Sequence, residues 1–199
     1  RMTNSSDMDE RTLREIYLAS FEGAVKKSKP WTVMSSYNRI NGKFVGDRKE
    51  YLTDILREEW GFDGYVVSDW GAVNDRVSSL SAGLDLEMPP GDYENDRLIV
   101  KAVQEGKLDE KTVDLACERI LDVIFRYTEN RDENAVFEYE KDHKAAADIA
   151  AECMVLLKND NHILPLNAEK KIAFIGKYAR EPRYQGGGSS HINSWKVES

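Results

Sequence analysis

A carboxylate directly after a buried stretch is the residue best placed to carry out chemistry in this sequence. Asp69 follows the apolar run 64–67, which is typical of a fully buried strand, and precedes Trp70. A carboxylate fixed on a rigid strand end can attack the anomeric carbon of a sugar and form a glycosyl-enzyme, and a large ring beside it can shape a sugar pocket. The alternative is that Asp69 caps a helix or a loop by accepting backbone amides.

Two further residues stand at comparable positions. Tyr37 ends the preceding predicted strand, so we expect it next to Asp69, where its phenol could donate a hydrogen bond to the carboxylate. A partly buried tyrosine with a solvated hydroxyl is the alternative.

Glu87 ends the next strand and could complete a retaining pair, whose carboxyl groups lie only about 5 Å apart. A structural role, with Glu87 pairing with a Lys or Arg or capping a loop, is the other interpretation.

Other reactive residue types show no functional spacing. The glycine-rich stretch 186–191 lacks the Lys-Ser/Thr of a phosphate-binding loop and does not directly join a strand to a helix, so that match fails. A flexible hydroxyl-bearing loop that closes over a ligand and a plain surface loop are the two interpretations left open. The three histidines are scattered without metal-ligand spacing. Cys117 and Cys153 lie in helix-like stretches, form no CxxC or Cys/His cluster, and are predicted to be buried thiols, which fits a reducing compartment.

Alternating strand and helix patterns must position these residues. Helical periodicity is seen in the segment with Leu13, Ile16, Tyr17, Phe21 and Ala24, in the segment with Tyr51, Leu52, Ile55 and Leu56, and over roughly 93–105 and 109–127. Strand-like runs cover 31–37 and 64–67, and Asn41-Gly42 indicates a turn. This order predicts a parallel sheet with helical crossovers.

The predicted strands share polar carboxyl-terminal ends, at Ser35 to Asn38, Ser68 to Trp70 and Asp85 to Glu87. In a (β/α)8 barrel this end of the strands forms the active-site face. Three strands cannot close such a barrel. We therefore expect the fold class to be α/β, with residues 1–130 forming the C-terminal part of a TIM-like barrel whose opening strands precede Arg1.

A polar segment at 128–134 interrupts the pattern, and we place a domain boundary near residue 130. An Ala-rich helix over about 141–153 follows. A strand at 171–176 then opens a new β/α alternation, so residues 131–199 are predicted to hold a linker helix and the start of an α/β sandwich domain.

The composition excludes some classes of binding partner but does not point to one substrate. The net charge of −8 argues against a nucleic-acid partner, because phosphate binding needs clustered Lys and Arg. No apolar stretch is long enough to span a membrane, and no signal peptide is visible. Neither end resembles a natural domain terminus, so localisation is unknown, with the cytoplasm favoured over secretion.

Several motifs in register resemble glycoside hydrolase family 3 β-glucosidases over nearly the whole chain. They are VMSSYN at 33–38, LREEWGFDG at 56–64, SDW at 68–70, AGLDLEMP at 82–89, VLLKN at 155–159, ILPL at 163–166 and GGGSS at 186–190.

The resemblance implies a barrel followed by an α/β sandwich domain, with the substrate between them. Asp69 matches the family nucleophile and Tyr37 the tyrosine that touches it, whereas Trp70 and Met34 match residues that line the pocket. Ser189 matches a serine that reaches the sugar in some members. A Trp after the nucleophile favours β-D-glucosides, including short β-linked gluco-oligosaccharides, as substrates.

Two departures limit what the resemblance implies. The family's Lys-His pair and its earlier sugar-binding acid would precede Arg1, and its acid/base glutamate would follow Ser199. By the same resemblance Glu87 is a structural acid, so the Asp69/Glu87 pair is withdrawn. The expectation is retaining hydrolysis of terminal β-glucosidic bonds without a metal or cofactor, by a longer protein.

Two alternatives from other classes stay open. The isolated chain is expected to have little or no turnover, so it could be a non-catalytic fragment or a subunit that needs a complementing chain. The unpaired strand edges of an incomplete barrel favour such association or a homo-oligomer. A phosphate-binding α/β domain that uses the glycine-rich loop is a weaker alternative.

Overall fold

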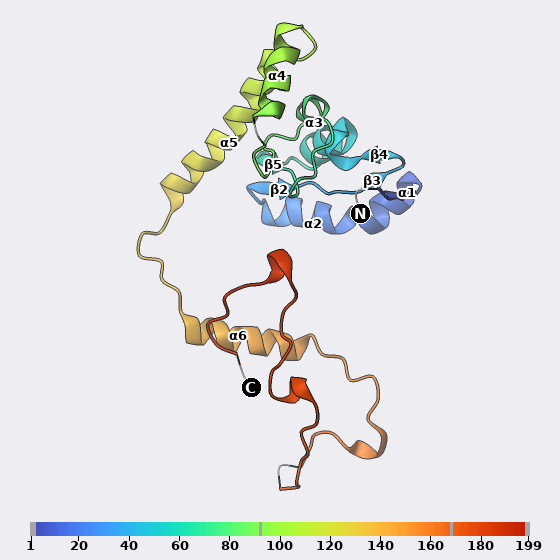
Figure 1. The fold of residues 1–199 in the computed structure, drawn as a ribbon, viewed down its shortest axis with the longest axis vertical. Helices are drawn as coiled ribbons and strands as arrows, with labels where there is room; N and C mark the ends of the chain where they lie inside the picture. The colour runs from blue at the N-terminus through green and yellow to red at the C-terminus, as the bar shows by residue number, and fades with distance from the viewer. Residues whose placement is uncertain (1–2, 92, 168, 198–199) are drawn as a thin grey trace. The chain divides into compact units, whose positions relative to one another are not determined.

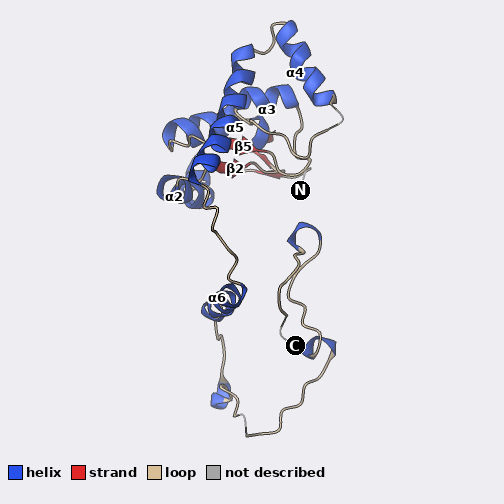
Figure 2. Ribbon diagram, turned by 90° about the vertical axis from the view of Figure 1, so that its left-hand side faces the viewer, coloured by secondary structure: helices blue, strands red, loops and turns tan. Residues whose placement is uncertain are grey.

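A computed structural model describes residues 3–91, 93–167 and 169–197. The chain divides into two compact units, Arg1–Arg131 and Asp132–Ser199, and each is described by itself. Figure 1 follows the chain through both units, and Figure 2 shows that the strands drawn belong to the first. In the part of the chain that the structure describes, no helix combines the length and apolar character that crossing a bilayer requires.

The first unit alternates short strands and helices. In chain order its elements are β1 (Ser5–Ser6), α1 (Glu10–Thr12), η1 (Leu13–Tyr17), α2 (Ala19–Ser28), β2 (Thr32–Met34), β3 (Arg39–Ile40), β4 (Lys43–Phe44), η2 (Val45–Asp47), η3 (Glu50–Glu59), β5 (Tyr65–Val67), α3 (Arg76–Ala82), α4 (Glu94–Gln104) and α5 (Glu110–Asn130).

The strands that carry the candidate site are parallel, as the alternating pattern predicts. β2 pairs with β5 in a register that places Met34 opposite Val67. A parallel bridge between Val67 and Leu86 adds a third segment on the other side of β5. Because carboxyl ends of parallel strands share one edge, the residues after Met34, Val67 and Leu86 lie at the same edge.

A second sheet has the order β1-β3-β4. Its antiparallel pair, β3 and β4, is joined by Asn41 and Gly42, both with positive φ, 49° and 82°. Two consecutive positive φ values suit Asn-Gly, so the turn predicted there is confirmed.

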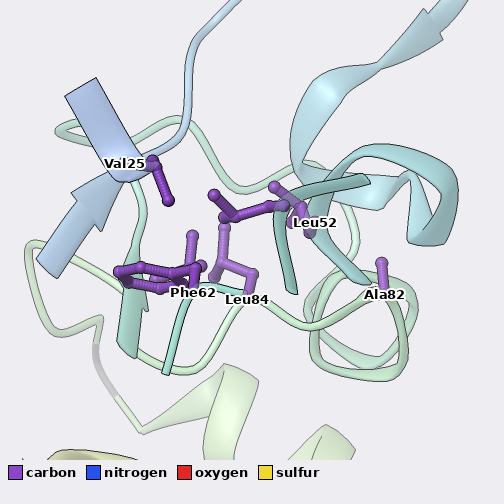
Figure 3. Packing of buried hydrophobic residues seen from close by; sticks show 7 residues of the cluster. Val25, Leu52, Phe62, Ala82 and Leu84 are labelled. Atoms are coloured by element: carbon purple, nitrogen blue, oxygen red, sulfur yellow. The ribbon is translucent and has the colours of Figure 1, made fainter. Parts of the chain in front are cut away.

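The core lies between the parallel strands and the helix η3. Leu52, Leu56, Phe62, Val66 and Leu84 are buried together in one cluster (Figure 3). The apolar face predicted for the helix that contains Tyr51, Leu52, Ile55 and Leu56 is confirmed, because all four side chains are buried. This packing holds β5 in place, and Val66 at the centre of the strand is completely buried.

The helices after β5 form a second cluster with Leu80, Ala102, Leu108 and Ala116. α3 begins with Asp75, whose side chain accepts the N–H of Ser78 at 2.7 Å. It ends at Gly83, whose φ of 109° is the left-handed conformation that glycine adopts without strain.

The apolar stripe of the first helical segment is only partly buried. The segment is helical over α1, η1 and α2, but Ile16, Tyr17 and Phe21 are exposed while Leu13 and Val25 are buried. Helical spacing reveals an apolar face without revealing which part of the protein covers it.

The second unit contains one long helix, α6 (Tyr139–Glu152), and the short turns η4 (Asp160–His162), η5 (Lys177–Ala179) and η6 (Gly188–Ser190). The strand predicted over 171–176 is absent from these described residues. A strand requires a hydrogen-bonded neighbour, and Phe174 and Ile175 are instead 78% and 89% exposed. That prediction is wrong for this structure.

The prediction of buried thiols is also wrong. Cys117 and Cys153 are both exposed. Cys117 follows Ala116, the one residue of α5 buried against the core, and therefore points off that face. Cys153 directly follows α6, of which no described residue is buried.

Candidate active site

Asp69 lies two residues beyond the end of β5, after the buried Ser68. Its side chain is half-buried, and Oδ1 accepts the N–H of Trp70 at 2.6 Å. The helix that follows is capped by Asp75, so Asp69 caps no helix, but its bond to the Trp70 N–H is the backbone contact that the loop-capping alternative describes. Asp69 thus stands at the strand edge in a short loop that its own backbone contacts help to shape.

That loop is tied to the segment after Leu86. The Ser68 hydroxyl accepts the N–H of Met88 at 2.8 Å and donates to the Met88 carbonyl at 3.1 Å. The same carbonyl accepts the N–H of Gly71 at 2.8 Å. These bonds bracket Asp69 on both sides and restrict where its carboxylate can point.

Tyr37, Trp70 and Met34 lie near the same edge. The Tyr37 hydroxyl donates to the main-chain carbonyl of Trp70 at 2.6 Å, one residue beyond the predicted acceptor, Asp69. The Trp70 side chain is 64% exposed and Met34, the last residue of β2, is 60% exposed. The structure therefore brings these three residues to one edge with Asp69 and leaves two apolar side chains available to a ligand.

Glu87 is held by its neighbours. Its Oε1 accepts from Asn95 Nδ2 at 2.7 Å, and its Oε2 lies 3.6 Å from Nε of the buried Arg76. Both residues line a cavity of about 430 Å³ beside Glu87. The structural interpretation of Glu87, an acid paired with an arginine, is the one that the structure shows.

Asp85 has a larger role than the sequence analysis assigned. Its carboxylate is buried, accepts from Arg57 Nη2 at 2.6 Å and from Arg119 Nη1 at 3.0 Å, and also accepts the N–H of Val66 at 2.7 Å. Burial lowers the pKa of Arg57, and the charge of Asp85 opposes that shift. The sequence marks Asp85 only as a polar residue at a strand end, although an acid between two leucines was a signal of a buried ion pair.

Ser189 lies in the second unit, in the turn η6, and is exposed. The Ser190 hydroxyl donates to the Gly187 carbonyl at 2.9 Å, so the glycine-rich stretch closes on itself as a turn. No group of three or more His, Cys, Asp or Glu side chains suited to a metal ion occurs among the described residues.

The sequence matches models of two domains of one protein family. The N-terminal domain of glycosyl hydrolase family 3 matches residues 2–123, and the C-terminal domain of the same family matches residues 154–199. The chain belongs to glycosyl hydrolase family 3. The resemblance drawn from the sequence motifs is thereby confirmed.

Relatives within family 3 carry two kinds of name. The thermostable beta-glucosidase B of Acetivibrio thermocellus is 54% identical over 198 residues, covering 100% of this chain and 26% of the relative. The exo-alpha-(1->6)-L-arabinopyranosidase of Bifidobacterium longum is 46% identical over 209 residues, covering 100% and 27%. The chain thus spans about a quarter of the length of these family 3 relatives.

Solved family 3 structures resemble the chain closely. The beta-glucosidase of Bifidobacterium adolescentis has a TM-score of 0.89 at 45% identity, covering 100% of this chain and 29% of that one. Beta-glucosidase 3B of Thermotoga neapolitana, solved with alpha-D-glucose, has a TM-score of 0.85 at 41% identity, covering 96% and 28%.

Proposed function

We propose that this chain is part of a longer retaining β-glucosidase and that Asp69 is its nucleophile. The observation that carries the proposal is the position of Asp69 at the carboxyl end of the central one of three parallel segments, beside the exposed Trp70 and Met34. A carboxylate at a rigid strand end, flanked by apolar surface, suits attack on a sugar ring that stacks against that surface.

The proposed domain organisation follows from the same segments. Residues 1–130 are the C-terminal part of a (β/α)8 barrel, in which β2, β5 and the segment at Leu86 are consecutive strands. Their parallel pairing supports this interpretation, because sequential strands of such a barrel are hydrogen-bonded neighbours. Residues 131–199 hold the linker helix and the start of the α/β sandwich domain.

In the proposed mechanism an Asp69 oxygen forms a bond to the anomeric carbon while the bond from that carbon to the leaving oxygen breaks. An acid supplied by another part of the longer protein protonates the leaving oxygen. Water then attacks the glycosyl-enzyme, returns a proton to that acid, and releases the sugar with its original anomeric configuration. Glu87 is unsuited to be the acid because Arg76 and Asn95 hold its carboxylate in place.

The other proposed site residues bind or orient. Tyr37, through its bond to the Trp70 carbonyl, fixes the main chain directly after the nucleophile. Trp70 and Met34 offer apolar surface to the sugar. The family resemblance alone supports Ser189 as a further sugar-binding residue. No metal or organic cofactor has a role in this chemistry.

The proposed substrate is a terminal β-D-glucoside or a short β-linked gluco-oligosaccharide. The beta-glucosidase names of several relatives support it. A second candidate is an α-L-arabinopyranoside, because two relatives at 46% identity carry the arabinopyranosidase name. Comparing kcat/KM for aryl β-D-glucoside and aryl α-L-arabinopyranoside on the full-length protein separates the two.

Replacing the nucleophile tests the mechanism. We expect Asp69→Ala in the full-length protein to lower turnover of an activated aryl glucoside by at least about 10³-fold, as loss of a reacting group does in other enzymes. Azide, entering the space left by the carboxylate, should restore turnover and give the α-glucosyl azide. Asp63→Asn is the matched control, because Asp63 is exposed and pairs with Arg126 away from the loop. Turnover that survives Asp69→Ala without azide would overturn the assignment.

A further inference from the structure

A buried cluster of one carboxylate and two guanidinium groups lies beside β5, the strand that leads to the candidate site. The Asp85 side chain is 1% exposed, and its partners are Arg57 from η3 and Arg119 from α5, with side chains 8% and 21% exposed. Removing one partner from a buried charged network is costly, because the remaining charge stays desolvated. The three side chains therefore hold η3, α5 and the segment at Leu86 in one arrangement.

The same carboxylate fixes β5. Asp85 Oδ2 accepts the N–H of Val66, while the Val66 carbonyl accepts the N–H groups of Asp85 and Leu86, each at 3.0 Å. Arg57 adds a bond from Nη1 to the Gly64 carbonyl at 2.8 Å, at the beginning of the strand. The position of β5 along its neighbour thus depends on the charged group of Asp85 as well as on backbone pairing.

The bonds continue into the loop that carries Asp69, three residues after Val66. Ser68 N–H donates to the Leu86 carbonyl at 2.9 Å, and the Ser68 hydroxyl and Gly71 both bond to Met88. Every one of these bonds requires the segment 85–88 to keep its register against β5. A shift of that segment would move the loop that carries Asp69.

We propose that Asp85 is a positioning residue for the nucleophile, acting through Arg57, Arg119 and the register between β5 and the segment 85–88. This inference rests on the proposed function, since it concerns the aim of the Asp69 carboxylate. The role is distinct from catalysis itself, because Asp85 is buried and bonds to the chain's own groups.

The test compares rates of glycosyl-enzyme formation in the full-length protein. Asp85→Asn keeps an acceptor for the Val66 N–H but removes the charge between the arginines. With a 2-deoxy-2-fluoro glucoside that carries an activated leaving group, we expect about 10- to 100-fold slower labelling, as a small misplacement of a reacting group produces. The final stoichiometry of one label per chain and the KM for an aryl glucoside should change little.

The stoichiometry distinguishes positioning from folding. A purely structural defect lowers the number of sites that can be labelled, whereas misplacement lowers the rate constant at each site. If Asp85→Asn does not fold, Arg119→Gln decides, because it removes only the partly exposed arm of the cluster and should also slow labelling. Arg126→Gln is the control and should label normally, because Arg126 is a partly exposed residue on the same helix that pairs with Asp63 and Asp122 and not with Asp85.

Failure of this inference and failure of the proposed function give different results. Unchanged labelling rates in Asp85→Asn and Arg119→Gln, with Asp69→Ala unlabelled, would overturn the role of Asp85 alone. Normal labelling of Asp69→Ala would overturn the nucleophile assignment, and with it the basis of the inference.

Discussion

At the residue scale, two carboxylates near one strand edge have different surroundings. Glu87 accepts a hydrogen bond from Asn95 at one carboxylate oxygen and lies against Arg76 with the other, so both oxygens have a polar neighbour. Asp69 accepts the N–H of the next residue and is half-buried at the end of β5. A nucleophile needs a carboxylate oxygen that can give up its hydrogen bonds and form a bond to carbon. Asp69 is therefore a better candidate than Glu87.

Asp47 offers a test of charge burial beside the site-bearing strands. One oxygen of its carboxylate is buried and has no hydrogen-bond partner among the described residues, while the other accepts from Asn74 at 3.3 Å. Burial raises the pKa of Asp47, and the nearby charge of Asp75 adds to the rise. A raised folded-state pKa stabilises the fold below the unfolded pKa, and this contribution is lost as pH rises through the folded pKa.

We therefore expect Asp47→Asn to raise the thermal unfolding midpoint at neutral pH. The gain in unfolding free energy should be no more than about 1 kcal/mol, because the Asp47 carboxylate is partly solvated. It should shrink as the pH falls through the carboxyl range, where Asp47 is protonated in the wild type. Asp54→Asn, which removes an exposed ion pair with Lys49, is the control without such a gain. A lower midpoint for Asp47→Asn at neutral pH would contradict this account.

At the element scale, strand and helix patterns predicted the segments that carry the site but not the contacts that fix them. The buried face of η3, the parallel pairing of β2 with β5, and the edge shared by Tyr37 and Asp69 follow from periodicity and strand order. The arginine partners of the buried Asp85 could not be predicted in this way. They lie 28 and 34 residues away in sequence, and no local pattern links residues so far apart.

The wrong strand prediction at 171–176 and the exposed apolar face of the first helical segment have one physical cause. The apolar residues of 171–176 and of the first helical segment have the right pattern for an element with a buried face. A pattern specifies a local conformation or face only when other parts of the protein cover it or pair with it. Both segments expose apolar side chains in this chain, so the missing information lies outside the segment.

The approach of β2 to β5 makes Gly64 a critical position. A Cβ added there would lie 1.9 Å from the carbonyl oxygen of Trp31, a main-chain atom that also accepts the N–H of Tyr65. Gly64→Ala would push the strands apart, and we expect a loss of about 1–3 kcal/mol in unfolding free energy, the cost of overpacking. Thermal or denaturant unfolding of the full-length protein measures it.

Gly23→Ala is the matched control. Gly23 lies inside α2, and apart from its chain neighbours and the helix's own backbone no atom lies within 4 Å of a Cβ added there. Alanine in a helix interior should raise stability by about 0.5–1 kcal/mol, because it restricts the unfolded chain. If the two substitutions changed the unfolding free energy equally, the close approach at Gly64 would not be the cause of the loss.

At the scale of the whole molecule, the chain leaves large apolar side chains uncovered in both units. Leu157 and Phe137 in the second unit and Phe125 in the first are examples, 91%, 81% and 61% exposed. The chain also spans only about a quarter of the length of its relatives. Exposed apolar surface and unpaired strand edges favour association with further protein.

We accordingly predict that the 199-residue chain by itself associates in solution and has no measurable turnover of an aryl glucoside. Light scattering and a kinetic assay on the purified chain check the two parts. Adding the complementary parts of the longer protein should restore turnover if they reassemble. A clean monomer with substantial turnover would contradict the view that essential groups lie outside this chain.

The most direct test of the central claim is to trap the covalent intermediate. The full-length protein is treated with a 2-deoxy-2-fluoro glucoside bearing an activated leaving group, digested, and mapped by mass spectrometry. The account predicts one label per chain, on the carboxylate of Asp69. A label on another carboxylate, or complete inactivation without a label on the peptide that contains Asp69, would contradict it.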